Sequence, residues 1–310
     1  MKNKLKLIVA SIVFATTANA NANNIPALDN LKPFYLTSQK SNMEDEKINR
    51  DRVISTINKD NLEEILNKLD KIVNLPKNIS RISNFGSDSS MLTMQTTTGE
   101  TVYFDNNVED FIVKGGQFTN LGDLLVSVDE VIKIKNNKAM FENLILPNKE
   151  YYAHFKTRDE NKEVKAEVYV LADYTCPYCK SLFSNVDTLN KIGVEVYFVP
   201  FLNGGLADKN SVKITRKILC SENKEEETIA AINDPKGFLS KINESELNCP
   251  ASFNVLKILN SSHSFDIEGT PTSILPNGHL FSGYSSIVNF VKDIAIGKFK
   301  GDAINNMNGE

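Results

Sequence analysis

Residues 167–179 read Glu-Val-Tyr-Val-Leu-Ala-Asp-Tyr-Thr-Cys-Pro-Tyr-Cys, and this segment carries the strongest indication of how the second half of the chain folds. Val168 to Leu171 form a short, continuous apolar run, which is typical of a strand buried on both faces. The run is followed by Cys176-Pro-Tyr-Cys179, in which Pro177 suits a first helical turn because proline has no N–H to leave unpaired. The sequence therefore predicts a strand over 167–171, followed by a helix from about Cys179 to Lys191 with both cysteines at its start.

Cysteines in this setting point to redox chemistry. Unpaired backbone N–H groups and the positive end of the helix dipole stabilise a thiolate at a helix start. Two intervening residues let the second sulfur reach the first and close a ring that can reopen. A zinc site built from all four cysteines is one alternative, but Cys220 and Cys249 stand alone instead of forming a second C-x-x-C pair. A second alternative is that Cys176 and Cys179 form an inert structural disulfide. We interpret Cys176 and Cys179 as a redox pair, with no metal and no further cofactor.

The elements around this pair form an α/β pattern. A second apolar strand is predicted over 194–199, and after a helical insertion a hairpin follows at 272–275 and 280–282, with Pro276-Asn-Gly278 as its turn. A closing helix is predicted from Ser286 to about Ile296. This half of the chain is therefore predicted to be a compact domain over 149–302.

The first half of the chain has a different pattern of apolar residues and predicted elements. Apolar residues from Leu62 to Val73 recur at helical spacing, with Asp60 as the expected cap and Pro76 as the end of the segment. Three short strands are predicted over 91–97, 101–104 and 111–113, and a connector helix after them, closed by Pro147. The predicted organisation is a signal peptide (1–20), an N-terminal dimerisation domain of mixed α/β structure (21–125, with 21–85 an extension), a connector helix (126–148), the catalytic domain (149–302) and a tail (303–310).

The chain start indicates export. Lys2, Lys4 and Lys6 precede an apolar run from Leu7 to Ala15, and Ala18-Asn-Ala20 supplies a cleavage signal, with a second cut after Ala22 as an alternative. A membrane anchor is the competing interpretation, but the run is too short to span a bilayer. The formal net charge of -4 gives no indication of a nucleic-acid partner. We therefore expect export to an oxidising compartment, where cysteines can be paired.

Several motifs in order resemble the bacterial periplasmic disulfide isomerases of the DsbC/DsbG family. They are Gly99-Glu-Thr-Val-Tyr-Phe-Asp105 with Gly115-Gly116, Asp173-Tyr-Thr-Cys-Pro-Tyr-Cys179, the later cysteine pair, and Gly269-Thr-Pro-Thr272 ahead of Asn277-Gly278 and Gly283-Tyr284. The resemblance covers about residues 90 to 300 and leaves 21–85 unexplained. It implies a thioredoxin-like fold, of α/β (α+β) class, for the catalytic domain.

The resemblance also assigns roles. It implies that Thr270, Pro271 and Tyr178 bind substrate and that Pro271 follows a cis bond, against the alternative of a plain turn proline. It implies a structural disulfide between Cys220 and Cys249; a second redox pair is the alternative. Asp173 matches the isomerase pattern and could serve as a turn residue or as a proton acceptor. Val170 stands where thioredoxin has a buried Asp.

The implied function is thiol:disulfide interchange. A disulfide isomerase or reductase of this kind would act on misfolded or misoxidised exported proteins, as a homodimer kept reduced by a membrane reductase of DsbD type. The alternatives are a DsbA-like thiol oxidase, and a chaperone or assembly factor for a secretion or conjugation apparatus.

Overall fold

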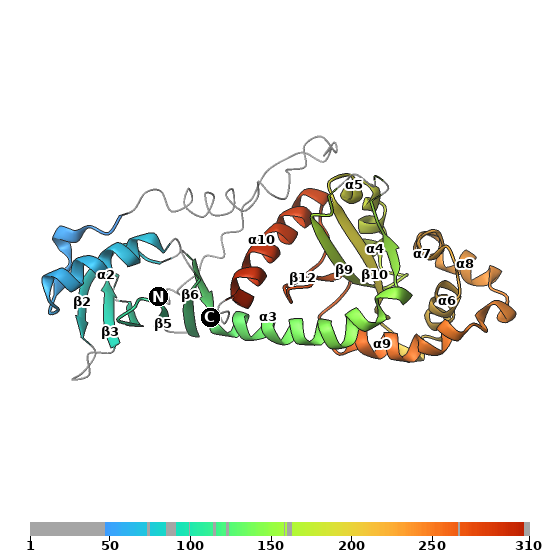
Figure 1. Cartoon of the computed structure of the whole chain (residues 1–310), viewed down its shortest axis with the longest axis horizontal. Helices are drawn as coiled ribbons and strands as arrows, with labels where there is room; N and C mark the ends of the chain where they lie inside the picture. The colour runs from blue at the N-terminus through green and yellow to red at the C-terminus, as the bar shows by residue number, and fades with distance from the viewer. Residues whose placement is uncertain are drawn as a thin grey trace. The chain divides into compact units, whose positions relative to one another are not determined.

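The computed structural model describes residues 47–306, apart from 73–74, 85–90, 99, 114–115, 122–123, 158, 160–162 and 266 (Figure 1). These residues form two compact units, the first ending at Ile132 and the second beginning at Lys133. The predicted signal peptide, the predicted extension before Lys47 and the last four residues of the predicted tail lie outside the described residues. None of the helices described is long and apolar enough to cross a membrane.

The first unit contains a sheet whose strands lie in chain order. Its described strands are β1 (Ile54–Ser55), β2 (Ile79–Asn84), β3 (Met91–Thr96), β4 (Thr101–Asp105), β5 (Asp110–Val113), β6 (Gly116–Leu121) and β7 (Leu124–Ser127). The pair β1–β2 is parallel and each later pair is antiparallel. The three strands expected between residues 91 and 113 correspond to β3, β4 and β5, whereas the sequence analysis did not identify the other four.

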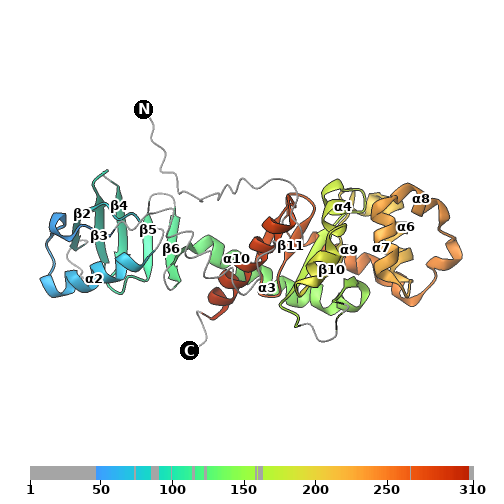
Figure 2. The same cartoon turned by 90° about the horizontal axis from the view of Figure 1, so that it is seen from above.

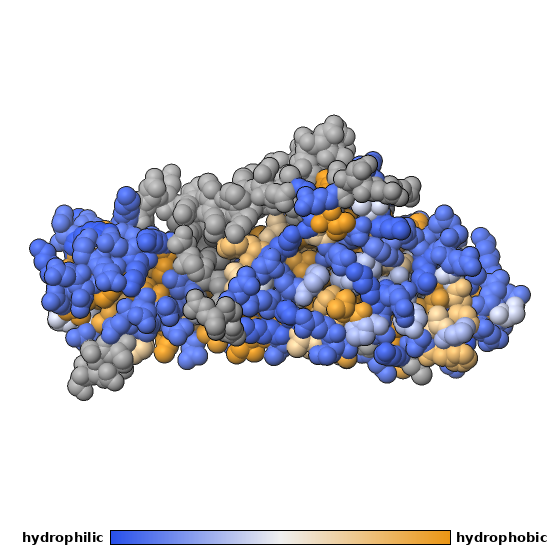
Figure 3. Space-filling view, viewed as in Figure 1, coloured by the Kyte–Doolittle hydropathy of each residue, from blue (hydrophilic) through white to orange (hydrophobic). Residues whose placement is uncertain are grey.

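Helix α2 (Lys59–Lys71) packs its apolar side against this sheet (Figure 2). Leu66 and Leu69 are buried together with Phe104 and Phe111 of the strands, whose rings stack. In Figure 3 the outward surface around α2 is mostly hydrophilic, with hydrophobic residues visible beside the strands. The helix is therefore a packing element, as its stripe predicts.

Both ends of α2 are closed by polar groups. The prediction that Asp60 caps the helix is wrong, because the side-chain oxygen of Asn58 accepts a hydrogen bond of 2.9 Å from the backbone N–H of Asp60. At the other end the buried Lys77 donates to the carbonyl oxygens of Leu69 and Ile72, at 2.5 and 2.7 Å. Burial lowers the pKa of Lys77 to about 8.

The second unit is built on a mixed sheet. Among the described residues its order is β12 (Leu280–Ser282), β11 (Thr272–Ile274), β9 (Ala166–Ala172), β10 (Val194–Pro200) and β8 (Ala153–Phe155). Only the β9–β10 pair is parallel. Nearly every residue of β9 and β10 is buried, as expected for central strands covered on both faces. Strand β8 was not predicted from the sequence.

The connector belongs partly to the second unit. Helix α3 (Val128–Met140) continues into a π-helical turn, Phe141–Ile145, and a 3-10 helix, Leu146–Tyr151. Phe141 and Ile145 are buried in the second unit's core, and the ring of Phe141 lies edge-on to Tyr169 at 4.8 Å between centroids. The compact unit therefore begins earlier than the predicted boundary at residue 149, because these apolar side chains pack onto the sheet.

Two predicted helices differ from the observed ones. The helix expected over 179–191 is two helices, α4 (Pro177–Phe183) and α5 (Val186–Lys191), because Ser184 and Asn185 both hydrogen-bond the carbonyl of Ser181. The closing helix α10 runs from Ile287 to Asn306, so residues 303–306 are helical and not a tail. Its end is held by Asn305, whose side chain donates to the carbonyl of Asn277 at 2.8 Å.

The insertion between β10 and β11 is helical, as predicted. Its described elements are η5 (Gly205–Ala207), α6 (Lys209–Leu219), α7 (Lys224–Asn233), α8 (Pro235–Lys241), η6 (Glu244–Leu247), η7 (Pro250–Asn254) and α9 (Val255–His263). Within this unit, α6, α7 and α8 gather on the side of the sheet's strands away from α10 (Figures 1 and 2).

Candidate active site

The loop between β9 and α4 is shaped by the carboxylate of Asp173, which is buried. Its Oδ1 accepts hydrogen bonds from the backbone N–H and the hydroxyl of Thr175, at 2.7 and 2.6 Å, and its Oδ2 accepts from the backbone N–H of Asn203 at 2.8 Å. Cys176 N–H donates to the carbonyl of Asp173. Asp173 is therefore a turn residue that joins the cysteine loop to the segment after β10.

This role predicts a large loss of stability on Asp173→Ala. The substitution leaves two backbone N–H groups and a hydroxyl without their acceptor, so we expect the free energy of unfolding to fall by about 2–4 kcal/mol. Urea unfolding measures it. Glu226→Ala, an exposed residue of α7, should change stability by less than about 0.5 kcal/mol; equal effects of the two substitutions would contradict the assigned role of Asp173.

The two cysteines of α4 have different environments. Cys176 is the N-cap residue and is partly exposed, whereas Cys179 is completely buried. Burial raises the pKa of the Cys179 thiol well above its ordinary value. Position 170, where thioredoxin has a buried Asp, is occupied by the apolar Val170, which is buried in β9. Cys179 is thus held as a buried neutral thiol, whereas Cys176 is partly exposed.

The proline loop lies against Cys176. The peptide bond between Thr270 and Pro271 is cis, and the Cys176 thiol donates to the carbonyl oxygen of Thr270 at 3.2 Å between Sγ and O. The carbonyl of Pro271 accepts from Gly283 N–H at 2.7 Å, which ties the loop to the end of β12. The fold therefore brings together residues that are 94 positions apart in the sequence.

A pocket opens beside the Thr270–Pro271 loop. Its volume is about 490 Å³, within the range of ligand sites. Tyr178, whose side chain is 62% exposed, lines it together with Thr270 and Pro271. Further lining residues include Tyr284, Phe290, Glu268 and Asp293, to which the sequence patterns assign no role. Gly283-Tyr284 was noted as part of a motif, but no local signal marks Asp293, which lies in the second turn of α10.

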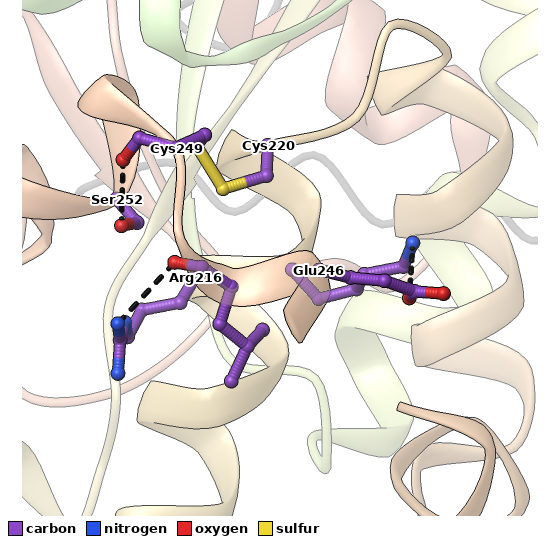
Figure 4. The surroundings of a disulfide bond; sticks show 7 residues. Arg216, Cys220, Glu246, Cys249 and Ser252 are labelled. Atoms are coloured by element: carbon purple, nitrogen blue, oxygen red, sulfur yellow. Dashed lines mark hydrogen bonds and ion pairs between the residues drawn. A yellow bond between two sulfur atoms is a disulfide. The ribbon is translucent and has the colours of Figure 1, made fainter. Parts of the chain in front are cut away.

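Cys220 and Cys249 lie outside this site and form a disulfide (Figure 4). The bond joins the C-cap of α6 to the residue before η7, and Ser252 donates to the carbonyl of Cys249 at 2.8 Å. In Figure 4 Arg216 reaches the same segment, where its guanidinium donates to the Leu247 carbonyl. The four cysteines therefore do not gather at one point, and within the described ranges no cluster of His, Cys, Asp and Glu could hold a metal ion.

The disulfide position leads to a second prediction. Cys220 and Cys249 are 29 positions apart in the sequence, and a disulfide that closes a loop of this length restricts the unfolded chain. Replacing both cysteines with serine should therefore lower the free energy of unfolding by about 3–4 kcal/mol. Denaturant unfolding of the oxidised wild type and of the Cys220→Ser/Cys249→Ser variant checks this value. Because the bond is remote from the Cys176 site, disulfide reduction by the folded variant should be retained; unchanged stability would contradict a structural role.

The sheet order, the helices and the placement of the cysteines are those of a thioredoxin-like fold, and residues 155–294 match the family model described as "Thioredoxin-like domain". The predicted fold of the second half is therefore confirmed. The thiol:disulfide interchange protein DsbC of Pasteurella multocida (strain Pm70) is 25% identical over 138 residues, 43% of this chain and 55% of that protein. The chain thus spans about half the length of this curated relative.

Two solved structures are also similar to about half of this chain. A disulfide interchange protein from Neisseria gonorrhoeae is 21% identical, with a TM-score of 0.37, over 47% of this chain and 96% of that one. The thiol-disulfide exchange protein alpha-DsbA2 from Wolbachia pipientis is 18% identical, with a TM-score of 0.42, over 55% of this chain and 98% of that one.

Proposed function

We propose that the protein is a thiol:disulfide oxidoreductase that uses Cys176 as nucleophile and Cys179 as the resolving thiol. The observation that carries this proposal is the contrast between the two sulfurs: one is partly exposed at a helix cap beside the Thr270–Pro271 loop, and the other is completely buried one turn later. The match to the thioredoxin-like domain family and the similarity to DsbC support it.

The chemistry follows from these positions. The Cys176 thiolate attacks one sulfur of a substrate disulfide, forms a mixed disulfide and releases the other substrate sulfur as a thiolate. In isomerisation the released thiol attacks a different disulfide of the same substrate, and Cys176 is finally displaced unchanged. In reduction Cys179 displaces the substrate, which leaves as a dithiol while the Cys176–Cys179 disulfide forms.

Within this class we propose isomerase or reductase activity in the periplasm, on misfolded or misoxidised exported proteins. The support is the resemblance of the Cys-Pro-Tyr-Cys and Gly-Thr-Pro motifs to the isomerases, with Thr270 before the proline. A membrane reductase of DsbD type would keep the pair reduced.

Two assays test this proposal. The full chain should reduce insulin disulfides with a thiol co-reductant and should reactivate scrambled ribonuclease. Alkylation trapping in the native host should find Cys176 and Cys179 reduced. An oxidised pair in the host, with thiol oxidation faster than ribonuclease reactivation, would instead assign the protein to the oxidases; absence of both activities would refute the proposal.

We further propose that the first unit makes a homodimer. Its sheet ends in strands β1 and β7, and edge strands offer unpaired backbone groups to a second chain. Ile112 on β5 is also 42% exposed. Two catalytic domains held in one dimer could act together on a misfolded chain, which exposes apolar surface.

The dimer proposal gives a third prediction. A variant without residues 21–132 keeps Phe141 and Ile145 in the core of the second unit. It should be monomeric and should still reduce insulin, whereas ribonuclease reactivation should fall about tenfold because two catalytic domains can no longer act together on one misfolded chain. Sedimentation of both proteins, with the two assays, measures this. A monomeric full chain, or undiminished reactivation by the short variant, would contradict it.

A further inference from the structure

The pocket beside Cys176 has an acidic end. Phe290 and Asp293 are three positions apart on α10, so they lie on one side of the helix, and both line the pocket. Glu268 lines it from the loop before Thr270 and is exposed at its edge. Among the described residues that line the pocket there is no Lys, Arg or His. The pocket's formal charge is therefore negative.

The charge of Asp293 is compensated only in part by its neighbours. Its side chain is half-buried, and no hydrogen bond or ion pair to another residue is present in the described part of the chain. Burial raises its pKa to about 6, and the neighbouring Lys292 opposes this only in part. The carboxylate thus remains mostly ionised at pH 7. A half-buried carboxylate whose charge is balanced only in part is unfavourable, and a cation entering the pocket would reduce that cost.

The walls of the pocket suit the stem of such a cation. The ring of Tyr284 lies edge-on to Phe290, with 5.7 Å between centroids, and Tyr178 and Pro271 add further apolar surface. Lysine and arginine combine a long aliphatic stem with a charged end, so they can pack against rings while the charge meets a carboxylate. An acidic substrate side chain would instead meet Asp293 and Glu268 with like charge.

We propose that this pocket is a subsite for a lysine or arginine side chain close in sequence to the substrate cysteine, with Asp293 as the specificity-determining residue. The inference rests on the proposed function, since it assumes that substrate disulfides reach Cys176. It gives that function a substrate class: polypeptides with a basic residue near the reacting cysteine.

The test uses short peptides that carry one cysteine as a mixed disulfide with an aromatic thiol. The Cys176 thiolate attacks the peptide sulfur, and the coloured aromatic thiolate leaves. The full chain carries Cys179→Ala so that the reaction stops at the peptide–Cys176 disulfide. The peptides differ only in having lysine, norleucine or glutamate at one of the positions flanking the cysteine, each of which is tried in turn.

At one or more flanking positions the lysine peptide should react about five- to tenfold faster than the norleucine peptide at low salt, with glutamate slowest. Adding Asp293→Asn should reduce the lysine-to-norleucine ratio to near one, and Asp293→Lys should favour glutamate. Glu226→Gln removes the same charge outside the pocket, on α7, and should leave the ratio unchanged. Salt should reduce the preference.

The outcomes separate the two proposals. If no peptide reacts, including norleucine, the proposed function fails. If all peptides react but lysine has no advantage at any position, or if the advantage survives both Asp293 substitutions, the subsite is refuted while the proposed function stands.

Discussion

The Cys176→Ser variant should lose disulfide reduction by more than about 10³-fold, because a serine hydroxyl cannot replace the thiolate that attacks the substrate disulfide. Cys179 cannot substitute for it. Its thiol is completely buried, and burial raises its pKa, so little attacking thiolate is present at neutral pH. Insulin reduction with a thiol co-reductant measures the loss.

The matched control makes the same atomic change elsewhere. Cys220→Ser/Cys249→Ser also replaces sulfur by oxygen, but at the disulfide of the helical insertion. After circular dichroism confirms that it is folded, this variant should keep most of the wild-type rate. Substantial activity in Cys176→Ser, or equal losses in both variants, would show that Cys176 is not the nucleophile.

The Cys179→Ala variant should accumulate mixed disulfides with substrate. Without the resolving thiol, the bond between Cys176 and the substrate can be broken only by an external thiol or by the substrate's own thiol. We expect the trapped species to rise from a trace to most of the protein, at least about tenfold, when a disulfide substrate is in excess. Non-reducing electrophoresis followed by mass mapping measures it.

Two further variants serve as controls for this trapping experiment. Cys176→Ser should trap nothing, and the Cys176→Ser/Cys179→Ala variant should also trap nothing. A mixed disulfide attached to Cys179 in the first variant, or no increase over wild type in Cys179→Ala, would contradict the assigned order of attack and resolution.

The sequence predicts the central part of the second unit well. The run from Val168 to Leu171 within β9 contains no charged residue, and a C-x-x-C motif with proline at the first helical turn marks the start of α4. The hairpin of β11 and β12 was also visible, since Pro276-Asn-Gly278 supplies a turn. Gly278 has a φ of +89°, and a Cβ there would overlap the backbone of Ile134 and Lys138.

The elements that were predicted wrongly or missed can each be explained by particular residues. The three-residue strand β8 is too short to show alternation. The interruption at Ser184 depends on side chains that bond the backbone, and the earlier cap at Asn58 was missed because Asp60 is an equally acceptable cap type. The start of the second unit was placed too late because the burial of Phe141 depends on a strand that lies later in the chain.

In the sequence, motifs mark only part of the candidate site. Cys176 and the Gly269-Thr-Pro-Thr272 segment have such motifs, and the structure places the Cys176 sulfur beside the Thr270 carbonyl. The isomer of an X–Pro bond is not determined by sequence, since trans predominates. Asp293 had no signal at all, because an acidic residue on an amphipathic helix normally faces solvent, and only the folded structure places it in the pocket.

Limited alkylation of the reduced protein distinguishes the attacking cysteine from the resolving cysteine in one experiment. Substoichiometric iodoacetamide at mildly acidic pH, followed by peptide mass spectrometry, measures which sulfur is the accessible nucleophile. The difference in burial and the raised pKa of the Cys179 thiol predict labelling almost wholly at Cys176. Dominant labelling at Cys179, or equal labelling of both cysteines in the folded protein, would contradict the account.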